Sequence, residues 1–133
     1  MTDAILAERV LHSIGRDWDF FWSNTHPDLV LEFPFASSVG MPTRVAGEAN
    51  THEYLGNVTT LLPDLAFRDV RVMPLAEPES YMLEYLGSSP AARNYEQIYV
   101  AIMKFKQGKL ILFREYWDTT EVARALGDET KKV

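Results

Sequence analysis

Apolar side chains recur at helical spacing at the start of the chain and at alternating spacing in most of the rest. Leu6, Val10 and Ile14 are four positions apart, which predicts an amphipathic helix within the first 24 residues. Gly15 interrupts this pattern, and Asp17 is a candidate N-cap for a second short helix. Both helices are expected to pack on a sheet.

The remaining pattern predicts six strands and two further helices. The strands are expected at residues 28–35, 44–45, 65–75, 80–87, 95–106 and 109–118, and the helices at about 48–62 and 119–126. Pro34 cannot donate to a ladder, so the first strand is expected to lie at an edge or to break there. This order predicts one α+β domain over residues 1–133, with helices covering one side of a strongly curved, mostly antiparallel, cone-shaped sheet. Such a cone has a cavity at its wide end, where a ligand can bind.

The stretch from Tyr95 to Asp118 reads as a long hairpin. Gln107-Gly108 is a strong two-residue turn signal, and it places Lys106 opposite Lys109. In that register one face of the hairpin is apolar except for Glu115. That face holds Ile98, Val100, Ile102, Phe113, Glu115 and Trp117. A slip of one residue would change which side chains share a face, so the site depends on this register.

Glu115 is the main candidate for chemistry. A carboxylate between Phe113 and Trp117 loses water, and desolvation raises its pKa toward the range useful for proton transfer. The alternative is a structural ion pair with an arginine of another strand, for which the candidates are Arg44, Arg68, Arg71 and Arg93. Tyr54 projects from the predicted helix at 48–62 and could bind a substrate oxygen, although a tyrosine there is also a common core residue. The expected pocket walls are Trp18, Phe33, Val58, Val100, Phe113 and Trp117.

The opposite face of the hairpin combines large apolar, aromatic and arginine side chains, a mixture that is common at protein interfaces. It predicts a two-fold homodimer through the outer face of the sheet. The residues expected there are Tyr99, Ala101, Met103, Leu112, Arg114 and Tyr116.

Composition narrows the classes of partner. The 133 residues carry a net charge of −6, which argues against a nucleic-acid ligand because phosphate binding needs clustered Lys and Arg. There is no cysteine, and the three histidines lack metal-ligand spacing. We find no Gly-rich phosphate loop and no long apolar run. The sequence therefore predicts a protein with no metal, no cofactor and no membrane span, and a cytoplasmic location is expected.

Several segments resemble the nuclear transport factor 2-like superfamily, in its SnoaL-like branch. They are EFPFA at 32–36, R-V-x-G at 44–47 and the hairpin F-x-x-GK followed by REYWD at 114–118. The stretches 47–64 and 108–127 are most similar to the small phenazine-biosynthesis condensation proteins. In those proteins the acid/base glutamate lies in the Arg-Glu pair of the last strand, which implies Glu115 here. Their second functional residue, a histidine, aligns with Tyr54, which puts the same condensation in doubt.

Other members of the superfamily match less well at the residues that carry their chemistry. The steroid isomerases use an Asp before the proline of the first strand, where this chain has Phe33. Their tyrosine falls near Arg9 and their second Asp near Val100 or Ala101, so their reaction is not expected. The Asp-Arg-Asp set of the related epoxide hydrolases is not recognisable either.

Two functional hypotheses result. The first is a cofactor-independent isomerase, cyclase or condensing enzyme that uses Glu115 for proton transfer on a small apolar, ring-containing metabolite. The second is a ligand-binding or dimerisation module of the same fold that keeps the pocket without chemistry, because a single carboxylate is a small catalytic set.

Overall fold

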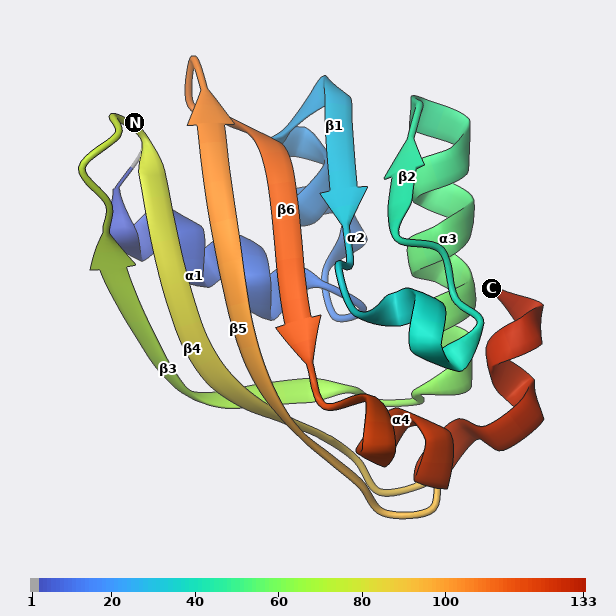
Figure 1. Cartoon of the computed structure of the whole chain (residues 1–133). Coiled ribbons are helices and arrows are strands. Elements are labelled where there is room, and N and C mark those ends of the chain that lie inside the picture. Colours follow the sequence, from blue (N-terminus) through green and yellow to red (C-terminus); the bar gives the residue numbers. More distant parts are fainter. Residues whose placement is uncertain (1–2) are drawn as a thin grey trace.

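The structure is built on one six-stranded sheet that curls around a group of helices (Figure 1). The computed structural model describes residues 3–133, so residues 1 and 2 of the predicted domain lie outside the described part. The strand order is β2-β1-β6-β5-β4-β3, and every neighbouring pair is antiparallel except β1 and β6. The strands are β1 Thr25–Glu32, β2 Arg44–Ala46, β3 Ala66–Pro74, β4 Ser80–Ser89, β5 Tyr95–Lys106 and β6 Lys109–Trp117.

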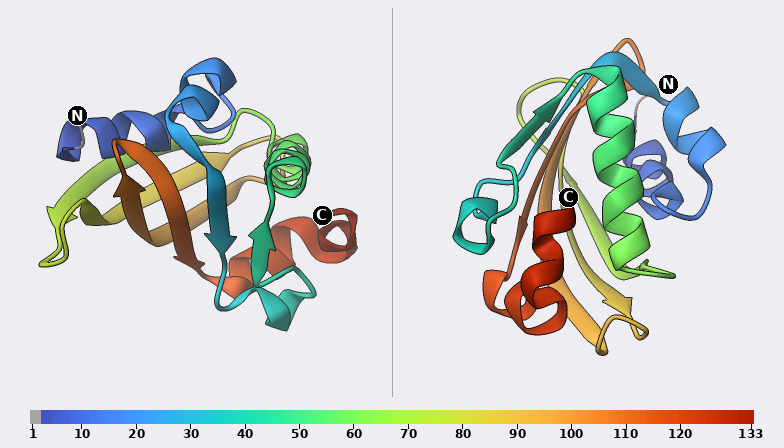
Figure 2. Two further views of the ribbon diagram at one scale, coloured as in Figure 1. Left: turned by 90° about the horizontal axis from the view of Figure 1, so that it is seen from above. Right: turned by 90° about the vertical axis from the view of Figure 1, so that its right-hand side faces the viewer.

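The first three α-helices lie on the concave side of the sheet, as Figure 2 shows from two further directions. α1 contacts β3, and α3 contacts β1 and β2. The helices are α1 Ala4–Ser13, α2 Trp18–Ser23, α3 Glu48–Leu61 and α4 Thr119–Leu126, with 3₁₀ turns η1 Ala36–Val39 and η2 Gly127–Lys132. The predicted α+β architecture is therefore confirmed. None of the helices within residues 3–133 is long and apolar enough to cross a membrane.

Local sequence signals account for most element boundaries. The Asp17 carboxylate accepts a hydrogen bond from the Phe20 amide at 3.1 Å, so it caps α2 as predicted. The hairpin turn forms at Gln107-Gly108, whose φ angles of 54° and 77° are those of the predicted two-residue turn. β1 ends at Glu32, before Pro34, although it lies between β2 and β6 rather than at an edge. Of the two predicted outcomes at Pro34, the break is the observed one.

The predicted register of the hairpin is wrong beyond its first two pairs. Lys106 pairs with Lys109 as expected, but a bulge shifts the register between Lys104 and Phe105. Ala101, and not Val100, therefore lies opposite Glu115. Glu115 stays on the inner face, and it is β5 that is turned over relative to the prediction. Tyr99, Ala101 and Met103 point into the core, with exposed fractions of 3%, 0% and 0%, and are not part of the outer face.

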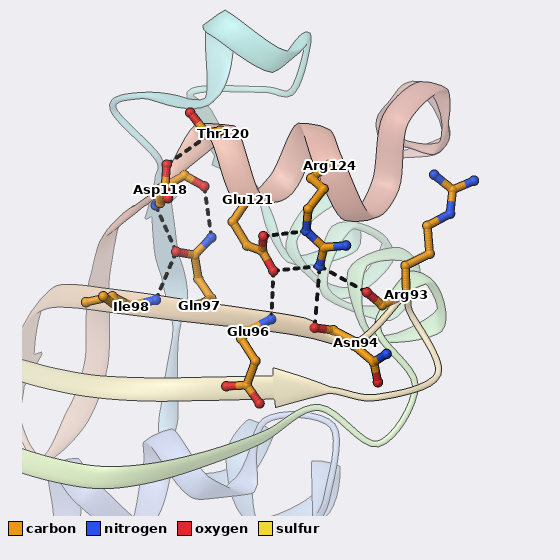
Figure 3. Close-up of polar contacts among 9 residues, drawn as sticks. All are labelled: Arg93, Asn94, Glu96, Gln97, Ile98, Asp118, Thr120, Glu121 and Arg124. Atoms are coloured by element: carbon orange, nitrogen blue, oxygen red, sulfur yellow. Dashed lines mark hydrogen bonds and ion pairs between the residues drawn. The ribbon is translucent and has the colours of Figure 1, made fainter.

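The end of the hairpin is held by the buried side chain of Gln97 on β5 (Figure 3). Its amide nitrogen donates to the Asp118 carbonyl and its amide oxygen accepts from the Asp118 amide, both at 2.9 Å. Asp118 also caps α4 by accepting from the Thr120 amide at 2.9 Å. Asp118 and Glu121 have the spacing of a capping box, but the box is only half formed, because Glu121 accepts from the Glu96 amide instead of the cap amide. These bonds place α4 against β5, at the end of the strand that carries Glu115.

Candidate active site

A cavity lies between α3, the concave face of the sheet and α4. It contains about 670 Å³ of empty space, counting the part that is open to solvent. Its wall is almost entirely apolar and is formed by Ile14, Phe33, Met41, Tyr54, Leu55, Val58, Thr59, Leu61, Leu62, Leu65, Phe67, Tyr95, Tyr99, Phe113, Glu115, Trp117, Val122 and Leu126.

Glu115 is the one carboxylate in this wall, and it is 9% exposed. Burial raises its pKa from 4.5 to about 7, and a hydrogen bond from Tyr85 partly offsets that rise. No described cation pairs with Glu115: Arg68 and Arg71 pair with Glu96 and Glu84. The structural ion pair considered from the sequence is therefore absent within residues 3–133. A carboxyl group with a pKa of about 7 can accept and return a proton near neutral pH.

The two carboxylate oxygens of Glu115 have different surroundings. The Tyr85 hydroxyl donates to Oε2 at 2.5 Å, whereas no described residue donates to Oε1. No fully buried side-chain oxygen or nitrogen within residues 3–133 lacks a partner, so Oε1 borders the open space of the cavity. Tyr85 itself is 2% exposed and does not line the cavity. Tyr85 therefore binds Oε2 from outside the cavity wall and leaves Oε1 for a ligand.

Four buried tyrosines surround the carboxylate. The hydroxyls of Tyr95 and Tyr99 are 2.8 Å apart, and the Tyr99 ring stacks on Tyr85 with centroids 5.0 Å apart. Burial raises the pKa of all four phenols, Tyr54, Tyr85, Tyr95 and Tyr99, and the Glu115 charge raises each further. Each hydroxyl therefore keeps its proton near neutral pH and can donate a hydrogen bond.

Tyr54 of α3 is the tyrosine best placed to contact a ligand. Its ring stacks on Phe33, with centroids 5.1 Å apart at 26°. No hydrogen bond joins its hydroxyl to another described residue, and the lack of unpaired buried atoms in the described chain means that this hydroxyl is accessible. Tyr54 lines both this cavity and a neighbouring groove, so its proton is available to an acceptor in either space.

Gly87 on β4 makes room for the tyrosine cluster. A Cβ atom at this position would lie 2.6 Å from Cε2 of Tyr99 and 3.1 Å from Cδ1 of Phe67. The rings of Phe67 and Tyr99 meet edge to face at 5.6 Å above it. A side chain at residue 87 would displace the wall of the cavity.

Six of the eight predicted site residues lie together in the cavity wall, and two do not. Phe33, Tyr54, Val58, Phe113, Glu115 and Trp117 all line it. Val100 does not, because the bulge turns its side chain to the outer face of β5. Trp18 does not line it either: its ring packs on Phe21 and Trp22 within α2, at 5.6 and 5.8 Å.

Sequence reasoning missed the three tyrosines contributed by β4 and β5. Tyr95 and Tyr99 belong to the alternating set Tyr95, Gln97, Tyr99, Ala101, Met103 and Phe105, which contains no charged residue. The other set of β5 contains Glu96, Lys104 and Lys106. Alternation over all twelve residues of β5 therefore indicated which face is buried. No comparable local signal pairs Tyr85 with Glu115, thirty positions away.

Comparisons with known proteins identify the fold. No protein-family model matches the chain. An uncharacterized PhzA/B-like protein of Pseudomonas aeruginosa is 29% identical over 120 residues, covering 85% of this chain and 79% of that protein. A phenazine biosynthesis-related protein of Pseudomonas aeruginosa aligns with a TM-score of 0.77 at 18% identity, covering 92% of this chain and 78% of that one. An NTF2-like protein of Burkholderia xenovorans aligns with a TM-score of 0.67 at 18% identity, covering 91% and 92%.

The chain therefore has the nuclear transport factor 2-like fold, and the predicted resemblance to the phenazine-biosynthesis proteins is confirmed.

Proposed function

We propose that this protein is a cofactor-independent acid/base enzyme acting on a small, apolar, ring-containing metabolite, in an isomerisation, cyclisation or condensation. The observation that carries the proposal is Glu115: a buried carboxylate with a pKa of about 7 and one oxygen facing an apolar cavity. A carboxyl group in that state can both accept and return a proton near neutral pH. The resemblance to phenazine-biosynthesis proteins supports this general class of chemistry.

The proposed step is proton transfer at a carbon next to a carbonyl. Oε1 of ionised Glu115 takes the proton, and the electron pair of the C–H bond moves toward the carbonyl oxygen. The Tyr54 hydroxyl donates a hydrogen bond to that oxygen as its charge develops. Return of the proton from Glu115 to a different atom gives an isomer, and attack of the enol carbon on a second carbonyl gives a cyclised or condensed product. Tyr85 orients the carboxylate throughout.

Deuterium exchange tests this proposal without knowledge of the natural substrate. Cyclic ketones such as 1-tetralone are incubated with the protein in D₂O, and NMR measures deuterium incorporation at the α-carbon. The wild-type protein is expected to accelerate exchange, and Glu115→Gln to lower the rate by at least about 100-fold with ligand affinity within about tenfold. Exchange by Glu115→Gln at the wild-type rate would refute the proposal.

The second candidate is a ligand-binding protein without chemistry. It is favoured by one observation: Glu115 is the only residue of the wall that ionises near neutral pH. The same experiment separates the two functions, because a binding protein would bind the ketone without accelerating the exchange of its α-protons. A solvent-like pKa of Glu115 in a carboxyl NMR titration would also favour binding alone.

We also propose that the chain forms a homodimer through the convex face of the sheet. Ile98 on that face is 70% exposed, and it lies next to Leu86 of β4. Leu112 and Tyr116 of the predicted patch alternate with buried residues of β6, which places them on the same face. Sedimentation velocity is expected to show a dimer, and Ile98→Asp a folded monomer. A monomeric wild-type protein would contradict this proposal.

A further inference from the structure

Charge is distributed very unevenly around the cavity. Among residues 3–133, its wall contains one carboxyl group, Glu115, and no lysine, arginine or histidine. The other polar side-chain groups of the lining residues are the phenols of Tyr54, Tyr95 and Tyr99, the alcohol of Thr59 and the indole N–H of Trp117. A ligand in this space meets hydrogen-bond donors and acceptors but no positive charge.

Three arginines on or beside the elements that form the cavity are directed elsewhere. Arg114, next to Glu115 in sequence, lies on the other face of β6 and pairs with Glu32 at 2.7 Å. Arg124 of α4 bonds Glu121 and the backbone carbonyl of Arg93. Arg44 lines a separate groove, which shares only Tyr54 with the cavity.

An anionic group inside the cavity would therefore be buried without a counter-charge. Burial of an unpaired charge is strongly unfavourable, and ionised Glu115 would add repulsion in a medium of low dielectric constant. A neutral oxygen acceptor has no such cost. It can also accept a hydrogen bond from the Tyr54 hydroxyl. When Glu115 is protonated, it can accept a second hydrogen bond from the carboxyl group.

We propose that the substrate enters this cavity as a neutral ring compound with a carbonyl oxygen, and that ring compounds carrying a carboxylate or another anionic group inside the cavity are excluded. This inference rests on the proposed function and specifies its substrate class. Tyr54 binds the carbonyl oxygen, Glu115 faces the adjacent carbon, and the apolar wall selects for an uncharged ring.

The test compares three probes of similar shape: 1-tetralone, 1-naphthoate and 1-naphthylmethylammonium. Their dissociation constants are measured by calorimetry at about pH 6 and about pH 8.5, on either side of the Glu115 pKa of about 7. We expect 1-tetralone to bind at both pH values. We expect 1-naphthoate to bind at least about tenfold more weakly at pH 6, and more weakly again at pH 8.5 as Glu115 ionises.

Glu115→Gln is the matched control for the effect of pH. The groups facing Glu115 are Tyr54 from α3, Tyr85 from β4, and Tyr95 and Tyr99 from β5. Burial raises the pKa of each phenol, so all four phenols stay neutral between about pH 6 and about pH 8.5. Of these five groups, Glu115 is the one that titrates in that range. The additional loss of 1-naphthoate binding at pH 8.5 should disappear in Glu115→Gln.

Three outcomes would overturn the inference. They are binding of 1-naphthoate as tight as that of 1-tetralone, tighter binding of the ammonium probe than of the ketone at pH 8.5, and no 1-tetralone binding at about 1 mM. If naphthoate binds and Arg44→Gln abolishes that binding, the anion sits in the neighbouring groove, and its exclusion from the cavity is upheld.

The two proposals fail separately. Charge preference without deuterium exchange would leave a binding site for neutral rings and would refute the catalytic role. Exchange that requires Glu115 together with tight naphthoate binding would refute only the substrate class.

Discussion

The two faces of the β5–β6 hairpin differ more than their sequences suggest. On the convex face, Arg114 and Glu32 form an ion pair at 2.7 Å, and their side chains are 33% and 29% exposed. One residue further along β6, on the concave face, Glu115 pairs with no cation of the described chain and accepts a hydrogen bond from the Tyr85 hydroxyl alone among the described side chains. The hydrogen bond that Arg114 donates to Glu32 raises the pKa of Arg114, whereas loss of water raises the pKa of Glu115. The charges on one face are paired and hydrated, whereas the other face carries the buried carboxyl group for which we propose proton transfer.

This difference depends on one bulge near the turn. Without it, Val100 rather than Ala101 would lie opposite Glu115, and Tyr99 would point to the outside. A correct prediction of the strands therefore does not fix the register. Every predicted strand can form while the side chains expected on one face of β5 lie on the other. The following experiments test the difference between the faces, from the largest expected effect to the smallest.

A charge placed on the concave face should have the largest effect. Ala101 is 0% exposed and lies opposite Glu115, so Ala101→Asp buries a second carboxylate with no partner. The free energy of unfolding should fall by about 3–5 kcal/mol in urea denaturation. The control Ile98→Asp, on the exposed face of the same strand, should change it by no more than about 1 kcal/mol when both variants and the wild-type protein are compared at a concentration at which all three are monomeric. A larger loss of stability in Ile98→Asp than in Ala101→Asp would support the register predicted from the turn alone, in which Ile98 shares the inner face with Glu115.

The pH dependence of stability should also report Glu115. Its pKa is about 7 in the folded state and 4.5 ordinarily, so the folded chain binds more protons than the unfolded chain between these values. This contribution to the free energy of unfolding is complete below about pH 4.5 and is lost as the pH rises through 7. The expected loss is about 3 kcal/mol.

Glu115→Gln should abolish this decline. Glu121 changes the stability in the opposite direction with pH. It accepts hydrogen bonds from the Arg124 guanidinium and the Glu96 amide, which hold its pKa at about 2, so its contribution is present at higher pH and is lost as the pH falls. The difference between wild-type protein and Glu115→Gln, measured by urea denaturation from about pH 4 to 9, isolates the Glu115 contribution. Parallel curves for the two proteins would mean that the pKa of Glu115 is not raised.

Gly87→Ala should distort the cavity. The added methyl group would lie 2.6 Å from the Tyr99 ring, so we expect a loss of about 1–3 kcal/mol in stability and weaker ligand binding. Gly56→Ala is the matched control, because nothing lies within 4 Å of its added Cβ in the middle of α3. Gly56→Ala should gain about 0.5–1 kcal/mol. Equal effects of the two substitutions would refute close packing at residue 87.

Tyr85→Phe should have the smallest effect on stability, about 1 kcal/mol. Its diagnostic effect is on Glu115: the Tyr85 hydrogen bond lowers the pKa of Glu115, so its removal raises that pKa further. Carboxyl NMR titration measures this shift directly. The pH profile of deuterium exchange should move to higher pH by the same amount, with the plateau reached only at alkaline pH. An unchanged titration would exclude Tyr85 as the residue that positions Glu115.

The sequence alone determined the elements of this protein and the candidate acid. Helical and alternating periodicity, the Asp17 cap and the Gln107-Gly108 turn depend on interactions within a few residues, so they can be read locally. The position of Glu115 between Phe113 and Trp117 on one strand face is local in the same way.

Only the tertiary structure decided what surrounds that acid. The bulge between Lys104 and Phe105 brought Tyr99 and Ala101 to the concave face and sent Val100 outward. Tyr85 approaches from a strand thirty positions away, and Tyr54 from a helix on the opposite wall. Contacts of this kind depend on how strands align and helices dock, which is set by packing over the whole core and not by the preference of any short segment.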